Sequence, residues 1–246
     1  MTTGLTLGKF APFHRGHELV VKTALAEVDR LVVVAYGSSL TRVPLQVRAG
    51  WIRSLYPRAE VLEAWGGPED CGDARETELV QEGFLKAFLA GRRIDRFYSS
   101  EAYGEHVSRS LGAEDRRVDM ARALVPVSGT ALRADPYAWR GYVDPLVYRD
   151  LVARAALVGA PGTGKTRLAE ALAARLGTVW MPEYGREYWE EHQVARRLTP
   201  GDLEEIARAH AEREDALALD ADRWLVSDTC ALTTRAFALD YHGGAS

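Results

Sequence analysis

Cysteine is scarce in this chain, and the two that occur lie far apart. Among 246 residues, only Cys71 and Cys230 are cysteines. Two distant cysteines provide neither the disulfide framework of a small secreted domain nor the closely spaced pairs of a four-ligand zinc site. Hydrophobic residues make up 47% of the chain, which is enough to bury cores without such crosslinks.

Long apolar runs and an excess of positive charge are also missing. No run approaches the ~20 apolar residues that a membrane helix needs, and the residues after Met1 do not resemble a cleavable signal segment. The formal net charge of -4 gives no sequence-independent attraction to nucleic acid. We therefore expect a cytoplasmic protein with small-molecule substrates and no nucleic-acid or membrane partner, and a homo-oligomer stays open.

What the chain does contain is a regular alternation of short apolar strands and helical segments. This alternation is typical of parallel sheets built from βαβ units, whose ligands bind outside the carboxyl ends of the strands. The expected strands are 2–8, 30–36, 59–62, 95–99, 155–158, 178–181 and 224–227, and the expected helices are 14–27, 47–55, 77–90, 168–176 and 231–241. The length exceeds one average domain. We predict two α/β domains, residues 1–150 and 151–246, with 135–149 as an ordered connector.

The segment 8–17, GKFAPFHRGH, joins the first expected strand to the first expected helix. His14 and His17 are three residues apart and project from one face at the helix start, where free amides and the helix dipole favour anionic oxygens. Gly8 and Gly16 allow the backbone to approach a phosphate closely. The segment predicts a nucleotide phosphate site, to which we also assign Phe10.

A second polar segment, 127–133 with the sequence VSGTALR, offers complementary groups. Ser128 and Thr130 provide hydroxyls and amides at a helix start, and Arg133 lies one turn further on as a cation for a triphosphate. A simple helix cap explains Ser128 and Thr130 equally well when this segment is considered alone.

The segment 159–166, GAPGTGKT, is a complete Walker A loop between an expected strand and an expected helix. Amides of a loop that contains Gly159, Gly162 and Gly164 would enclose the β-phosphate, Lys165 would reach the β and γ oxygens, and Thr166 would hold Mg²⁺. The strand 224–227 ends at Asp228, which is the position of a Walker B carboxylate that orients hydrated Mg²⁺. An aspartate at this place can also be a helix cap.

The first two segments resemble the HxGH and ISxTxxR signatures of nucleotidyltransferases, and their fusion to a P-loop resembles the NadR-type bifunctional enzymes of NAD salvage. Further support comes from 98–101, 183–187 and 228–234, although Cys230 stands where the family often has a second acidic residue. Many relatives begin with a helix-turn-helix domain, which does not precede Thr2 here, so transcriptional regulation is not implied.

The resemblance implies a Rossmann-like nucleotidyltransferase domain followed by a P-loop kinase domain. The first would transfer AMP from ATP to nicotinamide mononucleotide, giving NAD and pyrophosphate, with His14, His17 and Arg133 stabilising charge on the phosphates. The second would phosphorylate nicotinamide riboside with ATP and Mg²⁺, using Lys165 and Asp228, and Glu183 competes with Asp228 for the role of positioning the hydroxyl or the metal.

Several alternatives stay open at this stage. We expect the kinase domain to be truncated or degenerate, because only three strands are recognisable in it, and its activity to be low. Another phosphate acceptor, such as phosphopantetheine or glycerol phosphate, and a non-catalytic nucleotide sensor are the rival functions. The sequence does not choose between the amide and the acid of the pyridine mononucleotide. Trp65, in an expected loop 64–68, either stacks on the pyridine ring or packs at a rim.

Overall fold

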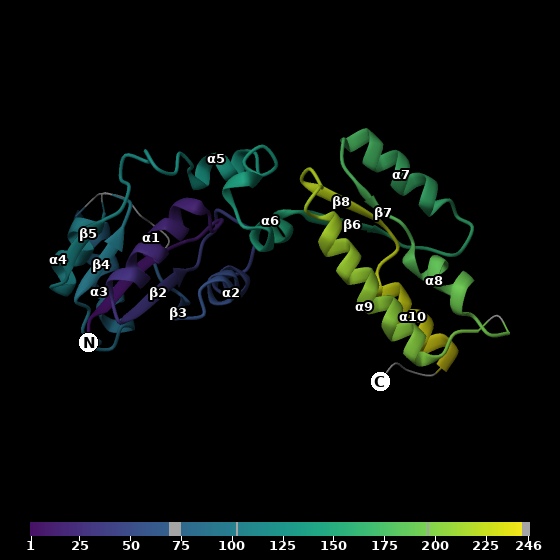
Figure 1. Cartoon of the computed structure of the whole chain (residues 1–246), viewed down its shortest axis with the longest axis horizontal. Coiled ribbons are helices and arrows are strands. Elements are labelled where there is room, and N and C mark those ends of the chain that lie inside the picture. The colour runs from purple at the N-terminus through teal and green to yellow at the C-terminus, as the bar shows by residue number, and fades with distance from the viewer. Residues whose placement is uncertain (69–74, 102, 196, 243–246) are drawn as a thin grey trace. The chain divides into compact units, whose positions relative to one another are not determined.

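The computed structural model describes residues 1–68, 75–101, 103–195 and 197–242. The chain divides into two units, Met1–Val147 and Tyr148–Ser246. Each unit is an α/β structure with its own parallel sheet (Figure 1). The predicted fold class is therefore confirmed. No helix in the described ranges is long and apolar enough to cross a membrane.

The first unit contains a five-stranded sheet in the order β3-β2-β1-β4-β5, with every neighbouring pair parallel. Its elements are β1 (Thr3–Gly8), α1 (Arg15–Glu27), β2 (Arg30–Tyr36), α2 (Leu45–Leu55), β3 (Ala59–Ala64), α3 (Arg75–Phe88), β4 (Arg96–Ser99), α4 (Gly104–Leu111), β5 (Glu114–Arg117), α5 (Gly129–Ala134), the 3-10 helix Arg140–Tyr142 and α6 (Pro145–Leu151), in which the unit boundary falls. The sequence patterns predicted the first four strands and the first three helices within a few residues.

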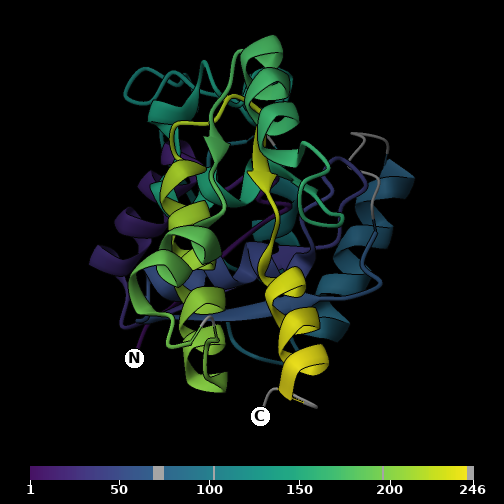
Figure 2. The ribbon, with the colours of Figure 1, turned by 90° about the vertical axis from the view of Figure 1, so that its right-hand side faces the viewer.

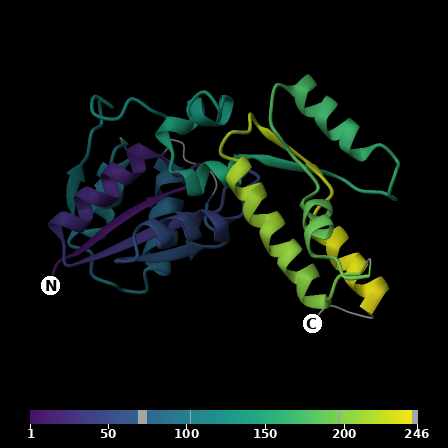
Figure 3. The same cartoon turned by 45° about the vertical axis from the view of Figure 1, so that its right-hand side comes forward.

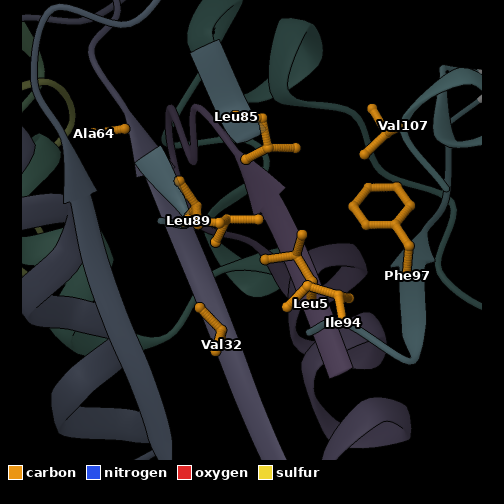
Figure 4. Packing of buried hydrophobic residues seen from close by; sticks show 9 residues of the cluster. Leu5, Val32, Ala64, Leu85, Leu89, Ile94, Phe97 and Val107 are labelled. Atoms are coloured by element: carbon orange, nitrogen blue, oxygen red, sulfur yellow. The ribbon is translucent and has the colours of Figure 1, made fainter. Parts of the chain in front are cut away.

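Helices cover both faces of this sheet. Figure 4 shows side chains from α3 and α4 packed over one face, where they meet those of the central strands; the cluster comprises Leu5, Val32, Val34, Ala64, Leu85, Leu89, Ile94, Phe97 and Val107. Alternate residues of β2 point to the opposite face, and Leu31 and Val33 are fully buried there, where α1 and α2 contact the strands. A strand buried on both faces reads as a continuous apolar run, which is why β2 was predictable.

The second unit has a smaller sheet in the order β6-β8-β7, again parallel. Its elements are β6 (Ala153–Leu157), α7 (Lys165–Leu176), β7 (Trp180–Met181), α8 (Tyr184–His192), α9 (Pro200–Leu217), β8 (Trp224–Asp228) and α10 (Ala231–His242). Figure 2 shows β8 leading towards α10, in yellow, and α10 lies beside α9 (Figure 3). The three strands that the sequence predicted are all present.

Six elements were not predicted: β5, α4, α6, α8, α9 and the 3-10 helix Arg140–Tyr142. The sequence EDRR of β5 has no apolar residue, so the strand has no hydrophobic pattern, and charge pairs such as Arg116 with Glu27 support it instead. α4, α8 and α6 are short, and α6 lies in the segment 135–149 that we expected to be only a connector. α9 did carry a readable signal, because Thr199 and Asp202 form a capping box with Pro200 at the first helical position.

Candidate functional site

A cavity of about 550 Å³ opens at the carboxyl ends of β1 and β4 in the first unit. These strands are neighbours at the point where the strand order of the sheet reverses, which is where open α/β sheets bind ligands. Of the residues that the sequence predicted, Gly8, Phe10, His14, Gly16, His17 and Arg133 line the cavity. The fold thus brings residues of both nucleotidyltransferase motifs to one place.

Hydrogen bonds from backbone amides fix the rings of His14 and His17 at the start of α1. The Nδ1 atom of His14 accepts a hydrogen bond from the Gly16 amide at 3.1 Å, and Nδ1 of His17 accepts one from the His14 amide at 3.3 Å. The two rings stack with centroids 3.8 Å apart. The sequence suggested that the amides here are free for an anion, but the imidazoles occupy the amides of His14 and Gly16.

This arrangement decides what the imidazoles offer to a ligand. Burial, followed by the charges of Arg122 and Arg133, lowers the pKa of His14 to about 4. Burial, His14 and Arg122 hold the pKa of His17 well below its usual range. Both rings are therefore neutral near pH 7, and since Nδ1 accepts, Nε2 carries the proton. Each histidine presents one N–H donor, which suits phosphate oxygens.

Two arginines place positive charge at the same end of the cavity. Arg133 of α5 donates to the Ala11 carbonyl oxygen at 2.7 Å and to Thr130 Oγ1 at 3.1 Å, so its position is fixed. Arg122 also lines the cavity, and its Nη2 lies 3.0 Å from Glu101 Oε1. Arg122 belongs to neither motif, and no sequence pattern indicated a role for it.

Arg122 is presented by a turn that the carboxylate of Asp119 organises. Asp119 accepts hydrogen bonds from the amides of Ala123, Leu124 and Val125. Asp119 and Arg122 both have left-handed backbones, with φ of 50° and 53°. Aspartate is common in turns because its carboxylate can accept hydrogen bonds from the amides of the residues that follow it. Asp119 is therefore the residue that could have indicated this turn from the sequence.

The glycines of the first motif have a role that the sequence did not reveal. A Cβ at Gly8 would lie 3.2 Å from the ring of Phe10, and one at Gly16 would lie 3.0 Å from the ring of His14. These glycines therefore make room for two rings of the site. Phe10, with φ of 44°, is buried and contacts the ring of His17 edge-on at 5.1 Å between centroids.

The hydroxyls of the second motif are both engaged within the protein. Ser128 Oγ accepts the Ala131 amide at 3.1 Å and so caps α5, while Thr130 Oγ1 accepts from Arg133. Neither is among the described residues that line the cavity. The hydroxyls thus shape the helix start and orient Arg133.

The second unit holds the Walker A loop between β6 and α7, as predicted. Gly159, Gly162 and Gly164 have φ of 153°, 77° and 88°, which side chains rarely allow, so the loop needs glycine at these positions. Lys165 Nζ donates to the carbonyl oxygens of Gly159 and Ala160 at 2.9 and 3.0 Å. The lysine therefore lies across its own loop, and residues 158–164 are exposed.

Asp228, at the end of β8, lies directly beside this loop. Its Oδ2 accepts a hydrogen bond from Thr166 Oγ1 at 2.5 Å, although the two residues are 62 positions apart. Asp228 is fully buried, and its Oδ1 has no hydrogen-bond partner in the described part of the chain. The structure thus brings the two predicted metal-binding residues together.

The remaining candidates lie elsewhere. Trp65 is 58% exposed and is not among the described residues that line the cavity. Glu183 precedes α8 and pairs with Arg186 at 2.7 Å, and no contact with Asp228 is found among the described residues. Cys71 lies outside the described residues, and Cys230 is a free thiol.

Comparison with known protein families is consistent with this division. The cytidylyltransferase-like family model matches residues 5–135, and the model of an AAA domain matches residues 154–246. The trifunctional NAD biosynthesis/regulator protein NadR of Escherichia coli (strain K12) is 28% identical over 266 residues, which cover 98% of this chain and 63% of that protein. NadR of Salmonella typhimurium (strain LT2) is 27% identical over 258 residues, with the same shares. The chain spans 63% of the length of these relatives.

Solved structures show the same fold. A crystal structure of NadR in complex with NAD and AMP-PNP superimposes with a TM-score of 0.60 at 21% identity, covering 96% of this chain and 72% of that one. A second, of NadR in complex with NR, gives a TM-score of 0.61 at 22% identity, covering 98% and 72%. Since the first family model spans more than half of the residues, the chain belongs to the cytidylyltransferase-like family, and an AAA domain follows in the same chain.

Proposed function

We propose that the first unit transfers AMP from ATP to nicotinamide mononucleotide, giving NAD and pyrophosphate. The observation that carries the proposal is the cavity at β1 and β4, where two neutral histidine donors and two arginines converge. The names of the relatives place them in NAD biosynthesis. The same relatives favour a pyridine mononucleotide over phosphopantetheine or glycerol phosphate as the acceptor.

The reaction needs no covalent enzyme intermediate. A phosphate oxygen of the mononucleotide attacks the α-phosphorus of ATP, a new P–O bond forms, and the bond to the β-phosphate oxygen breaks as pyrophosphate leaves. The Nε2–H groups of His14 and His17 donate to oxygens on which negative charge grows, and Arg133 and Arg122 neutralise it. Because the rings are already locked, little reorganisation is needed during the reaction.

We propose that the second unit binds ATP with Mg²⁺ at the Walker A loop. The Thr166 hydroxyl and the unpartnered Oδ1 of Asp228 are oxygen ligands of the kind that Mg²⁺ prefers, directly or through water. Bound there, the ion would neutralise charge on the phosphates. Lys165 would leave the carbonyls of Gly159 and Ala160 to contact the phosphates instead. Nicotinamide riboside is the proposed acceptor, with slow turnover because the loop is open to water.

Pyrophosphate release from ATP tests the first assignment. The panel of acceptors contains nicotinamide mononucleotide, nicotinic acid mononucleotide, phosphopantetheine and glycerol phosphate, with CTP as a second donor. We expect release with a pyridine mononucleotide and formation of the matching dinucleotide. Release with phosphopantetheine or glycerol phosphate alone would assign another acceptor, and ligand binding without release would identify a sensor.

A further inference from the structure

The cavity of the first unit has a second end, between α3 and α4, that contains no residue of the two nucleotidyltransferase motifs. The side chains there include aromatic, aliphatic and uncharged polar ones, Tyr36, Gln81, Leu85, Tyr103 and Val107, together with His106 and the charged Glu78, Glu105 and Arg109. The Tyr103 hydroxyl donates to the Leu7 carbonyl oxygen at 3.2 Å, which ties this wall to β1. Such a wall suits a flat ring with one polar substituent.

His106 is the buried polar group of this end. The side chain is 8% exposed, and its Nδ1 has no hydrogen bond within the described ranges. The position of His106 depends on where α4 begins. A Cβ at Gly104, the first residue of α4, would collide with the Ser99 side chain and lie 3.2 Å from the Arg117 guanidinium. Glycine thus lets α4 begin tightly against β4, and His106 follows two residues later.

The carboxylate of Glu82 faces one nitrogen of the His106 ring. Oε1 of Glu82 lies 3.5 Å from Nδ1 of His106. A carboxylate at that distance favours the tautomer with its proton on Nδ1, which leaves Nε2 as an acceptor. His14 and His17 are the opposite case, because their Nδ1 atoms accept from backbone amides and Nε2 donates.

A second observation concerns charge. Arg109 lines this end on α4, and it is already paired with Glu105. Glu78 also lines the cavity there and pairs with Arg75, as Glu82 does. A negatively charged ring substituent at this end would therefore meet the Glu78 carboxylate and a histidine lone pair.

We propose that His106, oriented by Glu82, is the residue that selects a carboxamide-bearing pyridine over its carboxylate analogue, by accepting an N–H of the amide at Nε2. The inference rests on the proposed adenylyl transfer and adds the residues that choose the acceptor. An amide supplies the donor that Nε2 lacks. A carboxylate supplies no proton and adds a negative charge beside Glu78 and Glu82, so it is rejected.

The test measures kcat and KM for pyrophosphate release with nicotinamide mononucleotide and with nicotinic acid mononucleotide. Binding of each mononucleotide alone, by titration calorimetry, gives a readout that is independent of turnover. For the unaltered chain we expect kcat/KM to favour the amide at least about tenfold. In His106→Ala the value for the amide should fall about tenfold, mainly through KM, while that for the acid stays within about twofold.

Two further variants keep the test decisive. Glu82→Gln retains the imidazole and the packing but removes the charge that orients it, so the preference for the amide should shrink even if His106→Ala folds poorly. His192→Ala, in the second unit, is the matched control and should leave the preference unchanged. Circular dichroism checks the fold of each variant.

Three outcomes would overturn the inference. Equal use of both mononucleotides by the unaltered chain, or equal losses for both in His106→Ala, would remove His106 as the selecting residue and leave the adenylyl transfer standing. No dinucleotide from either mononucleotide would overturn the proposed function and this inference with it.

Discussion

The two candidate nucleotide sites of this chain, the cavity of the first unit and the Walker A loop of the second, are organised in opposite ways. In the first unit, the side chains are fixed before any ligand arrives, because His14 and His17 cap the same helix start and Arg133 is tied to Ala11 and Thr130. In the second unit, the backbone is fixed by three glycines in conformations that other residues rarely adopt, while Lys165 lies on its own loop. Under the proposed functions, the first site would stabilise charge without rearrangement, and the second would have to move its cation to bind phosphate.

The supporting sheets differ in the same direction. The five-stranded sheet buries both faces of β2, whereas the edge strand β6, which leads into the Walker A loop, has no buried residue. A rigid, dry scaffold holds functional groups accurately, and an exposed edge does so less well. We therefore expect changes at the first site to have the largest effects.

Of the substitutions considered, His17→Ala should cause the largest loss of activity. It removes one Nε2–H donor of the cavity and also the acceptor of the His14 amide. We expect adenylyl transfer to fall on the order of a hundredfold or more, as for other positioned donors that stabilise a growing charge. Pyrophosphate release measures this loss, and circular dichroism confirms the fold. NAD synthesis at the original rate in a folded variant would remove the motif from the mechanism.

The low pKa of His14 predicts that acid weakens the first unit. Below about pH 6.5 the unfolded chain takes up a proton that the folded His14 does not accept until about pH 4. His14 alone should therefore lower the free energy of unfolding by about 3 kcal/mol as the pH drops from 7 to 4, and the low pKa of His17 acts in the same direction. Urea denaturation across this range, with amide exchange of residues 1–36 as a local probe, checks the sign. His14→Gln should reduce the dependence, leaving the part that His17 contributes, and an unchanged slope would contradict the assignment.

Arg122→Gln tests whether a cation outside both nucleotidyltransferase motifs contributes to the first site. We expect a roughly tenfold loss of kcat/KM for ATP, because one charge-assisted contact to the triphosphate disappears. Arg116→Gln, at the edge strand β5, is the matched control and should change this value little. Equal effects of the two variants would mean that only net charge matters.

Lys165→Ala should have the smallest effect on NAD synthesis. Since Lys165 and the two nucleotidyltransferase motifs lie in separate units, we expect adenylyl transfer to stay within about twofold of the unaltered rate. The unaltered chain should phosphorylate nicotinamide riboside slowly, because residues 158–164 are open to solvent. A kinase turnover of ~1 per second or faster, lost in Lys165→Ala, would show that the second unit is a working kinase.

Local patterns were sufficient for much of the fold. The buried strands β1 and β2 and the glycine-rich Walker A loop have signals within a few residues, because apolar runs and glycine spacing act locally. The motif positions of His14, His17 and Lys165 were readable for the same reason. The charged strand β5 was not, since its pairing partner, β4, decides that it is a strand.

The sequence by itself determined the alternation of strands and helices, the two nucleotidyltransferase motifs, the Walker A loop and the order of these motifs along the chain. Only the tertiary structure decided which nitrogen each histidine offers, because the hydrogen bonds at His14 and His17 and the Glu82 carboxylate beside His106 exist only after folding. The same holds for Arg122 near the histidines and for Asp228 beside Thr166. Apart from the local hydrogen bonds at His14 and His17, these contacts join residues that are distant in the chain, and no local pattern encodes a distance between them.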